Sequence, residues 1–471
     1  MTSRPIRVVA AGAALLAALA AGCTASGHEQ PRTAGSAVDV AGAGDPYFPT
    51  YGNSGYDVAG YRLRVRFDPD SDRLTGTATI TATATIDLTR FHLDLVGLTV
   101  SSVTVDGSAA RYRREGNELI ITPRAPLAVD RRFTVEVRYG GDPEPLVRDR
   151  LGRVGFMDTP DGAIALGQPE SASTWFPVND HPADKATYDI EITVPEGLAA
   201  LSNGVPGGRT TASGWTTWRW SQRAPMASYL TTLVIGDYRV TSGTHAGQPL
   251  VTAVPADLPP DHPAVVSLAR TGEIADFLAT RFGPYPFEAY GGIVVSDDRI
   301  RYALETQSRP VYGIGFFHAG PNTAVVAHEL AHQWFGNSVS IRRWRDIWLN
   351  EGFASYAEWL WEEHDVGHSV QESFLAEYDR TDWSEPALDP GPDEIFSRAV
   401  YKRGALAVHA LRLKVGDEAF FRILQTWTAQ RRHGNGTTDD FVALAERISG
   451  QRLADFLADW LSGTAAPSIP R

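Results

Sequence analysis

The sequence predicts a multi-domain fold of the β + α/β type, in which an N-terminal antiparallel, β-sandwich-like domain precedes a mostly helical domain. Three observations support this fold class. The chain has 471 residues, more than a single domain usually holds. Its first half alternates polar and apolar side chains with a period of two, and its second half repeats them with the period of an α-helix.

The β domain is predicted to span residues 46–241. Its clearest strand is the run 77–86, where threonine alternates with alanine or isoleucine without a break. Turn signals such as Asp106-Gly107 separate the strand-like runs from one another. The further runs are residues 61–67, 98–105, 118–122, 133–139 and 188–194. Short alternating strands joined by tight turns predict antiparallel pairing.

The helical domain is predicted to span residues 242–466. A first helix is expected over residues 264–282, because apolar residues recur there at helical spacing and Gly283-Pro284 follows as a stop signal. The further helices are expected at residues 319–334 and 351–364 and in amphipathic segments between residues 398 and 461. No internal repeat of solenoid length is present in the sequence.

Composition and charge exclude several classes of protein. Hydrophobic residues make up 43% of the chain and charged residues 21%, a balance that fits a packed globular protein and not a disordered one. The formal net charge is −13, and no long run of lysine and arginine occurs. No nucleic-acid partner is therefore expected, and solubility accounts for the acidity.

The first 22 residues predict a secretion signal peptide. Arg4 and Arg7 precede residues 8–21, an apolar stretch of 14 residues without a charge. A stable membrane span needs roughly 20 apolar residues, so cleavage is favoured over permanent anchoring by this helix.

Cys23 is the only cysteine of the chain, so the sequence allows no intramolecular disulfide. The stretch of residues 19–23 resembles a bacterial lipoprotein signal, in which the cysteine becomes the lipidated first residue, although Ala20 stands where that signal prefers a larger aliphatic residue. Residues 23–45 are small and polar and predict a flexible linker. The expected protein is exported and lipid-anchored at the extracytoplasmic face of the cell membrane, with plain secretion as the alternative.

The helix predicted at 319–334 carries a metal-binding pattern. His328 and His332 are four residues apart, so they share one face of the helix with Cβ atoms about 5–6 Å apart. A catalytic zinc takes three protein ligands, so a third ligand is needed. Glu351, at the start of the next predicted helix, can face the first helix across a loop. Two hydrogen-bonded histidines in a buried helix would be the purely structural alternative.

These residues resemble the motifs of the gluzincin aminopeptidases of family M1. That family has two histidines, eighteen intervening residues and a glutamate in an Asn-Glu-Gly-Phe-Ala setting. Here residues 333–350 supply the interval and residues 350–354 match the setting completely. The resemblance covers roughly residues 46–466.

The resemblance implies a thermolysin-like catalytic domain with one Zn²⁺ per chain, held by His328, His332 and Glu351. It also implies that Glu329 is the general base, which takes a proton from water and later delivers it to the leaving amine. The alternative for Glu329 is a solvated helix glutamate, which its apolar neighbours make a poor fit.

Exopeptidase activity requires a feature that captures a free N-terminal ammonium. The family uses a Gly-Ala-Met-Glu-Asn stretch, whose equivalent here is residues 302–306 with Glu305 in the glutamate position. The family's second amine ligand comes from a Gln-x-Glu or Gln-x-Gln segment shortly before Phe-Pro, which implies Glu170 in Gln168-Pro169-Glu170 here. The interval from Glu170 to Phe176-Pro177 is two residues shorter than the usual pattern. The alternative for Glu305 is an exposed loop carboxylate, and the alternative for Glu170 is a turn residue.

Residues 401–405 resemble the family's Tyr-x-Lys-Gly-Ala segment, whose tyrosine donates a hydrogen bond to the developing oxyanion. The resemblance implies this role for Tyr401. A phenol with a pKa near 10 stays protonated at neutral pH and can donate to negative charge. Without the resemblance, a tyrosine at a helix start would be read as a packing residue.

The expected function is that of a zinc metallo-aminopeptidase that acts on peptides with a free N-terminus. A metalloendopeptidase and a catalytically silent surface-binding protein of the same fold are the alternatives. Longer family members carry a C-terminal helical domain over the active site, so a short member is expected to have a more open cleft. The sequence does not define the preferred N-terminal residue, the physiological substrate or the oligomeric state.

Overall fold

The computed structural model describes residues 41–148 and 152–470. The predicted signal peptide, Cys23 and most of the predicted linker lie outside the described residues and stay predictions. Within the described ranges, no helix is both long and apolar enough to cross a membrane. The described end of the predicted linker is ordered, because Asp45 is buried and accepts a 2.9 Å hydrogen bond from the backbone N–H of Trp344.

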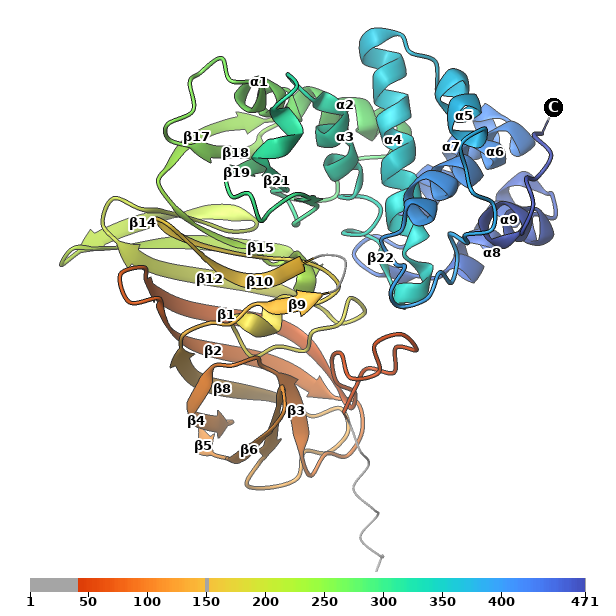
Figure 1. Ribbon diagram of the computed structural model, residues 1–471. Helices are drawn as coiled ribbons and strands as arrows, with labels where there is room; N and C mark the ends of the chain where they lie inside the picture. The colour runs from red at the N-terminus through yellow and green to blue at the C-terminus, as the bar shows by residue number, and fades with distance from the viewer. Residues whose placement is uncertain (1–40, 149–151, 471) are drawn as a thin grey trace, which may run out of the picture. The chain divides into compact units, whose positions relative to one another are not determined.

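The N-terminal domain is built on an eight-stranded sheet (Figure 1). Its order is β14 (Val205–Ala212), β15 (Trp215–Ala227), β12 (Lys185–Pro195), β1 (Tyr56–Asp68), β2 (Arg73–Ala84), β8 (Arg132–Gly141), β4 (Thr99–Val105) and β5 (Ser108–Ala109). The predicted antiparallel pairing holds for every neighbouring pair of this sheet except β1 and β12, which run parallel with Gly60 opposite Thr187. Alternation identified these strands, but it carries no information on the direction of a partner strand.

Two smaller sheets complete this domain. One has the order β13 (Ala199–Leu201), β16 (Leu233–Gly236), β11 (Gly162–Leu166), β10 (Gly152–Thr159) and β9 (Leu146–Arg148). The other has the order β3 (Phe91–Asp94), β7 (Glu118–Thr122) and β6 (Arg111–Glu115). The inward side chains of β1 pack against the first of these sheets, as in the 5.2 Å ring contact of Phe67 with Phe156. This sheet-on-sheet packing agrees with the sandwich-like prediction.

The second domain begins with a sheet of its own. Its order is β17 (Tyr238–His245), β18 (Gln248–Pro255), β19 (Tyr290–Val295), β21 (Val311–Gly313) and β20 (Ala303–Leu304), so β20 is an edge strand. The predicted domain boundary at residue 241 therefore falls inside β17. Helical periodicity dominates this part of the sequence, and the sheet was not predicted from it.

Helices make up most of the rest of the second domain, which also holds the short parallel pair β22 (Ser340–Ile341) and β23 (Asn435–Gly436). The helices are α1 (Pro263–Ala269), α2 (Thr271–Phe282), α3 (Thr323–Ala331), α4 (Trp348–Val366), α5 (Val370–Tyr378), α6 (Gly404–Val415), α7 (Asp417–Gln430), α8 (Thr438–Ser449) and α9 (Ala454–Ser462). The helix predicted at 264–282 is two helices, because Arg270 leaves the helical conformation with ψ of 3° and the Thr271 hydroxyl donates to the carbonyl of Leu268. α3 begins where Asn322 caps it by accepting from the N–H of Val325.

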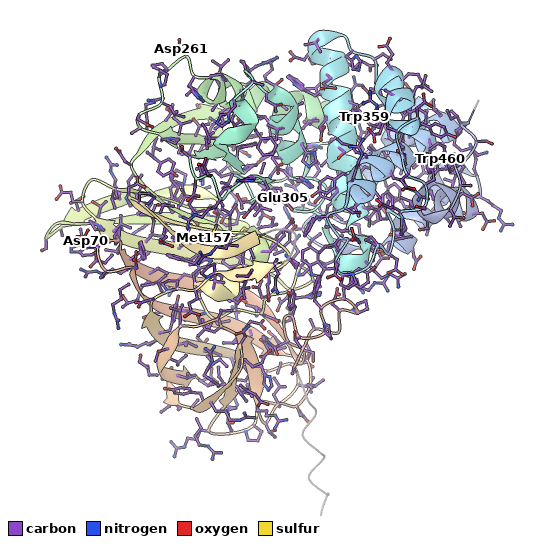
Figure 2. All side chains as sticks on the ribbon, in the orientation of Figure 1. Asp70, Met157, Asp261, Glu305, Trp359 and Trp460 are labelled. Carbon is purple, nitrogen blue, oxygen red and sulfur yellow. The ribbon has the colours of Figure 1, made fainter. Side chains whose placement is uncertain are left out.

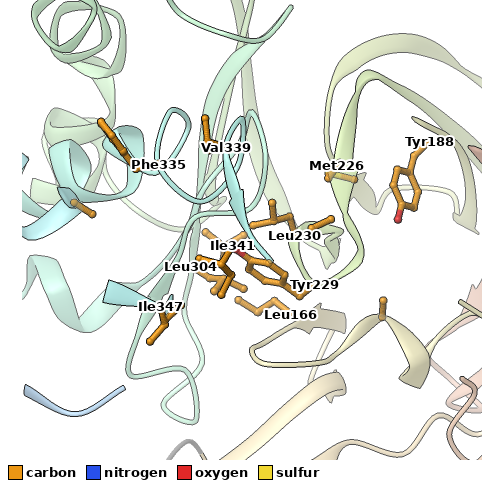
Figure 3. Packing of buried hydrophobic residues seen from close by; sticks show 14 of the residues in the cluster. Leu166, Tyr188, Met226, Tyr229, Leu230, Leu304, Phe335, Val339, Ile341 and Ile347 are labelled. Atoms are coloured by element: carbon orange, nitrogen blue, oxygen red, sulfur yellow. The ribbon is translucent and has the colours of Figure 1, made fainter. Parts of the chain in front are cut away.

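The two domains share one hydrophobic core. Leu166, Met226 and Tyr229 of the first domain belong to the same buried cluster as Leu304 and Ile341 of the second (Figure 3). This continuous packing determines which face of the β domain lies against the predicted site residues of the second domain.

Candidate active site

A close approach of helix backbones sets the positions of the site elements. α3 and α4 lie side by side in Figure 1. A Cβ atom on Gly352 of α4 would lie only 2.9 Å from the backbone of Gly404 at the start of α6. Glycine at both positions therefore lets the turn that precedes α6, which carries Tyr401, lie directly against α4.

The three predicted metal ligands come together. The Nε2 atoms of His328 and His332 lie 3.5 and 3.3 Å from Oε2 of Glu351. Each of the three residues offers one ligand atom, and these three atoms lie within 4.8 Å of one another. All three side chains are buried. Helical spacing in α3 and the loop between α3 and α4 bring this cluster together from two helices that follow each other in the sequence.

The surroundings of the cluster fit a zinc ion. The second ring nitrogen of each histidine already has a partner: Nδ1 of His328 lies 2.6 Å from Glu358 Oε1, and Nδ1 of His332 lies 3.1 Å from the carbonyl oxygen of Phe335. These contacts turn both Nε2 atoms toward Glu351. Two imidazoles and one carboxylate are a ligand set of a catalytic zinc, which keeps one position open.

The charges of the cluster also fit a cation. Burial acts to lower the pKa of His332, but the carboxylates of Glu351 and Glu305 outweigh it and raise that pKa to about 9. The two imidazoles in turn outweigh burial at Glu351 and hold its pKa at about 2. The buried carboxylates thus stabilise positive charge at the point where the ligand atoms meet.

Glu329 projects into the same buried region. One of its carboxylate oxygens lies within 4.8 Å of a carboxylate oxygen of Glu305 and of a ring nitrogen of His332. Only 4% of the residue is exposed. Burial raises the pKa of Glu329 to about 8 against the opposing effect of the two histidines. The alternative of a solvated helix glutamate is therefore wrong, and a carboxyl group of this kind can exchange a proton near neutral pH.

Glu305 follows edge strand β20 and is held by both domains. Its Oε1 accepts hydrogen bonds from Gln168 Nε2 at 2.7 Å and from the Tyr229 hydroxyl at 3.1 Å, and both donors belong to the first domain. Its main-chain oxygen accepts from Asn337 Nδ2 at 2.6 Å. With 2% of its surface exposed, Glu305 is no exposed loop carboxylate. Figure 2 labels its position between the sheets and the helices.

Glu170 does not take the place predicted for it. Its carboxylate pairs with the guanidinium of Arg148 and is not among the groups that line the cleft, whereas Gln168 lines the cleft and contacts Glu305. The short interval from Glu170 to Phe176-Pro177 was the signal that could have identified Gln168. When the interval is counted from Gln168 instead, it regains the two missing residues.

Tyr401 lies on a π-helical turn, Ala399–Arg403, with its ring 6.1 Å from that of His328 and nearly parallel to it. Burial raises the pKa of this phenol well above its usual value, and the nearby carboxylates of Glu351 and Glu305 act in the same direction. The hydroxyl group is therefore a protonated donor at any physiological pH.

One cleft of about 370 Å³ joins these groups. Its lining includes Gln168, Glu305, His328, Glu329, His332, Glu351, Glu358 and Tyr401. Gln168, Tyr229 and Glu358 were not predicted as site residues from the sequence. Glu358 could have been found, because it follows Glu351 by seven residues and so lies two turns further along the same helix face. Tyr229 carries no comparable signal.

Comparisons with known proteins agree with this architecture. Residues 57–230 match the Peptidase M1 N-terminal domain, and residues 318–460 match the Peptidase family M1 domain. The solved M1 zinc metallopeptidase from Deinococcus radiodurans is 32% identical, with a TM-score of 0.84 over 91% of this chain and 99% of that one. A mutant of that protein bound to a Tyr-Ser-Ala substrate is 31% identical, with a TM-score of 0.83 over the same shares of the two chains.

Two curated relatives are longer. Aminopeptidase N of Canis lupus familiaris is 28% identical over 64% of this chain and 34% of its own length. Aminopeptidase M1-B of Oryza sativa subsp. japonica is 27% identical over 87% of this chain and 50% of its own length. The chain thus spans between a third and a half of these relatives. Both family models and the near-complete match to the Deinococcus structure lead to one conclusion: the chain belongs to peptidase family M1.

Proposed function

We propose that the protein is a zinc metallo-aminopeptidase that releases N-terminal residues from peptides with a free amino terminus. The observation that carries this proposal is the position of Glu305 in the same cleft as the metal-ligand cluster and Glu329. A buried carboxylate beside a hydrolytic centre selects for a substrate that brings a positive charge with it. The aminopeptidase relatives and the tripeptide-bound Deinococcus structure support the same substrate class.

Five residues of the cleft take part in the chemistry of this proposal. His328, His332 and Glu351 would hold a zinc ion, which would supply Lewis-acid chemistry to the scissile carbonyl and to water. Glu329 takes the proton of the attacking water and delivers it to the leaving amine. The Tyr401 hydroxyl donates a hydrogen bond to the oxygen that becomes negative during the attack.

Amine recognition combines one carboxylate and one amide. The donors to the Glu305 carboxylate, Gln168 and Tyr229, both use Oε1, which leaves Oε2 for the ammonium of the substrate. The carbonyl oxygen of Gln168 provides a second acceptor, because its NH₂ group is already used on Glu305. An ammonium held here limits cleavage to the first peptide bond.

Hydrolysis of one peptide in three forms tests the proposal. The forms are the free peptide, its N-acetylated version and, as the matched control, its C-terminally amidated version. We expect kcat/KM to fall about 10²-fold on acetylation, because a neutral amide leaves the buried Glu305 carboxylate unpaired. Amidation of the C-terminus should change kcat/KM little. Metal analysis should find one zinc per chain.

Two outcomes would replace the proposal. Equal rates for the free and acetylated peptides would identify a metalloendopeptidase instead. A zinc-loaded protein that cleaves none of the three peptides would favour the catalytically silent binding protein.

We further propose that the protein is exported and anchored by a lipid on Cys23 at the extracytoplasmic face of the membrane. The arginine-led apolar segment before Cys23 supports this localisation. A radioactive fatty acid should label the wild-type protein in the membrane fraction, and Cys23→Ser should abolish the label and release the protein. An unlabelled wild-type protein in the medium would indicate plain secretion.

A further inference from the structure

Three consecutive side chains leave the π-helical turn Ala399–Arg403 in different directions. Tyr401 faces the ring of His328. Lys402 reaches α4, where its Nζ lies 3.3 Å from Oε2 of Glu358. Arg403 is fully buried and donates to main-chain oxygens, including that of Trp460 at 2.7 Å. Arg403 therefore ties the turn to the domain core, and the other two residues face the metal site.

Glu358 connects Lys402 to a metal ligand. Its two carboxylate oxygens have different partners, because Oε1 lies 2.6 Å from Nδ1 of His328 and Oε2 lies 3.3 Å from Nζ of Lys402. A continuous polar chain thus runs from the turn that carries Tyr401 to the imidazole of His328. An imidazole whose second nitrogen is held by a carboxylate is fixed in orientation and is a stronger metal ligand.

The Glu358 carboxylate lies among like charges. Glu351 precedes it by two helical turns and Glu362 follows it by one, and carboxylates four residues apart on a helix repel each other. In the described part of the chain, Lys402 is the one lysine or arginine that forms a salt bridge with Glu358. The exposed fraction is 23% for the Glu358 side chain and 26% for that of Lys402, so water screens this pair less than a surface pair.

We propose that Lys402 is a positioning residue that acts through Glu358 on His328 and links the turn of Tyr401 to the metal site. Lys402 balances the charge of Glu358 and holds it where it accepts from His328. The same contact keeps the turn of Tyr401 close to α4. The catalytic part of this inference rests on the proposed function, whereas the effect on metal affinity does not.

Substitutions at Lys402 test the inference. Lys402→Met removes the charge and keeps the length of the side chain, Lys402→Arg keeps the charge, and Lys414→Met is the matched control on the exposed face of α6. Competition with a chromogenic chelator gives the zinc dissociation constant, and peptide hydrolysis at saturating zinc gives kcat and KM. We expect Lys402→Met to weaken zinc binding about tenfold and to lower kcat with KM unchanged. Lys402→Arg and Lys414→Met should behave as wild type.

A double variant tests whether Lys402 acts through Glu358. Because Glu358→Gln removes the charge that Lys402 holds, the double variant Lys402→Met/Glu358→Gln should lose no more zinc affinity than Glu358→Gln alone. Additive losses would overturn the proposed route, and so would wild-type zinc affinity in Lys402→Met. Thermal unfolding should show that metal-free Lys402→Met is still fully folded at the assay temperature, and unfolding at that temperature would assign its effect to folding.

The two proposals can fail separately. If the wild-type protein hydrolyses no peptide and Lys402→Met still weakens zinc binding, the proposed function fails and the role of Lys402 in the metal site stands. If peptide hydrolysis is normal and Lys402→Met matches wild type in zinc affinity and kcat, the proposed function stands and the role of Lys402 fails.

Discussion

Replacing Glu329 by glutamine is expected to lower kcat about 10²- to 10⁴-fold and to leave zinc bound. The amide has nearly the same shape as the carboxylate, so the buried position beside His332 is kept. It cannot take a proton from water or return one to the leaving amine. Steady-state kinetics on a free peptide and metal analysis of the same preparation measure the two effects.

Glu418→Gln is the matched control, because Glu418 is almost fully exposed on α7, where its carboxylate lies 3.6 Å from the guanidinium of Arg422. It should retain wild-type kcat. A Glu329→Gln protein that binds zinc and keeps most of its activity would remove Glu329 as the general base. A variant that loses zinc together with activity would instead assign Glu329 to the metal site.

Replacing Tyr401 by phenylalanine is expected to lower kcat about 10²- to 10³-fold with little change in KM. The ring can keep its place beside His328, since only the hydroxyl group is removed. The lost group donates to charge that exists only during the reaction, so substrate affinity should be spared. Measurement of kcat and KM separately is therefore essential.

Tyr112→Phe provides the comparison for Tyr401→Phe. Tyr112 lies on β6, away from the cleft, and its hydroxyl donates to the carbonyl of Val100. We expect no kinetic change in this variant. If Tyr401→Phe raised KM and left kcat intact, Tyr401 would belong to substrate binding and not to oxyanion stabilisation.

The metal cluster could be predicted from the sequence because its geometry is local. Two histidines four residues apart on a helix must share a face, whatever the rest of the chain does. Glu351 needed more information, since a loop separates α3 from α4, and the family spacing supplied it. Helical periodicity also located α4 to within a few residues of its observed bounds, Trp348–Val366.

The amine site could not be predicted to the same extent, because its residues lie in irregular segments. Gln168 and Glu170 follow β11 in a stretch without a strand pattern, so periodicity does not decide which of them faces the cleft. Tyr229 reaches Glu305 across 76 residues of sequence, from a short turn after β15. Contacts of this kind depend on how the two domains pack, which no local pattern encodes.

The hydrogen bonds from Gln168 and Tyr229 to Glu305 have a thermodynamic consequence, because they cross from one domain to the other. Lys185 on β12 adds two further hydrogen bonds between the domains, because its ammonium group donates to the carbonyl oxygens of Asn337 and Ser338. In the proposed function, a substrate ammonium that bound both Gln168 and Glu305 would favour the docked arrangement of the domains. By reciprocity, domain docking favours substrate binding by the same free energy. Substitutions in this interface can therefore tune substrate affinity without touching a group that takes part in the chemistry.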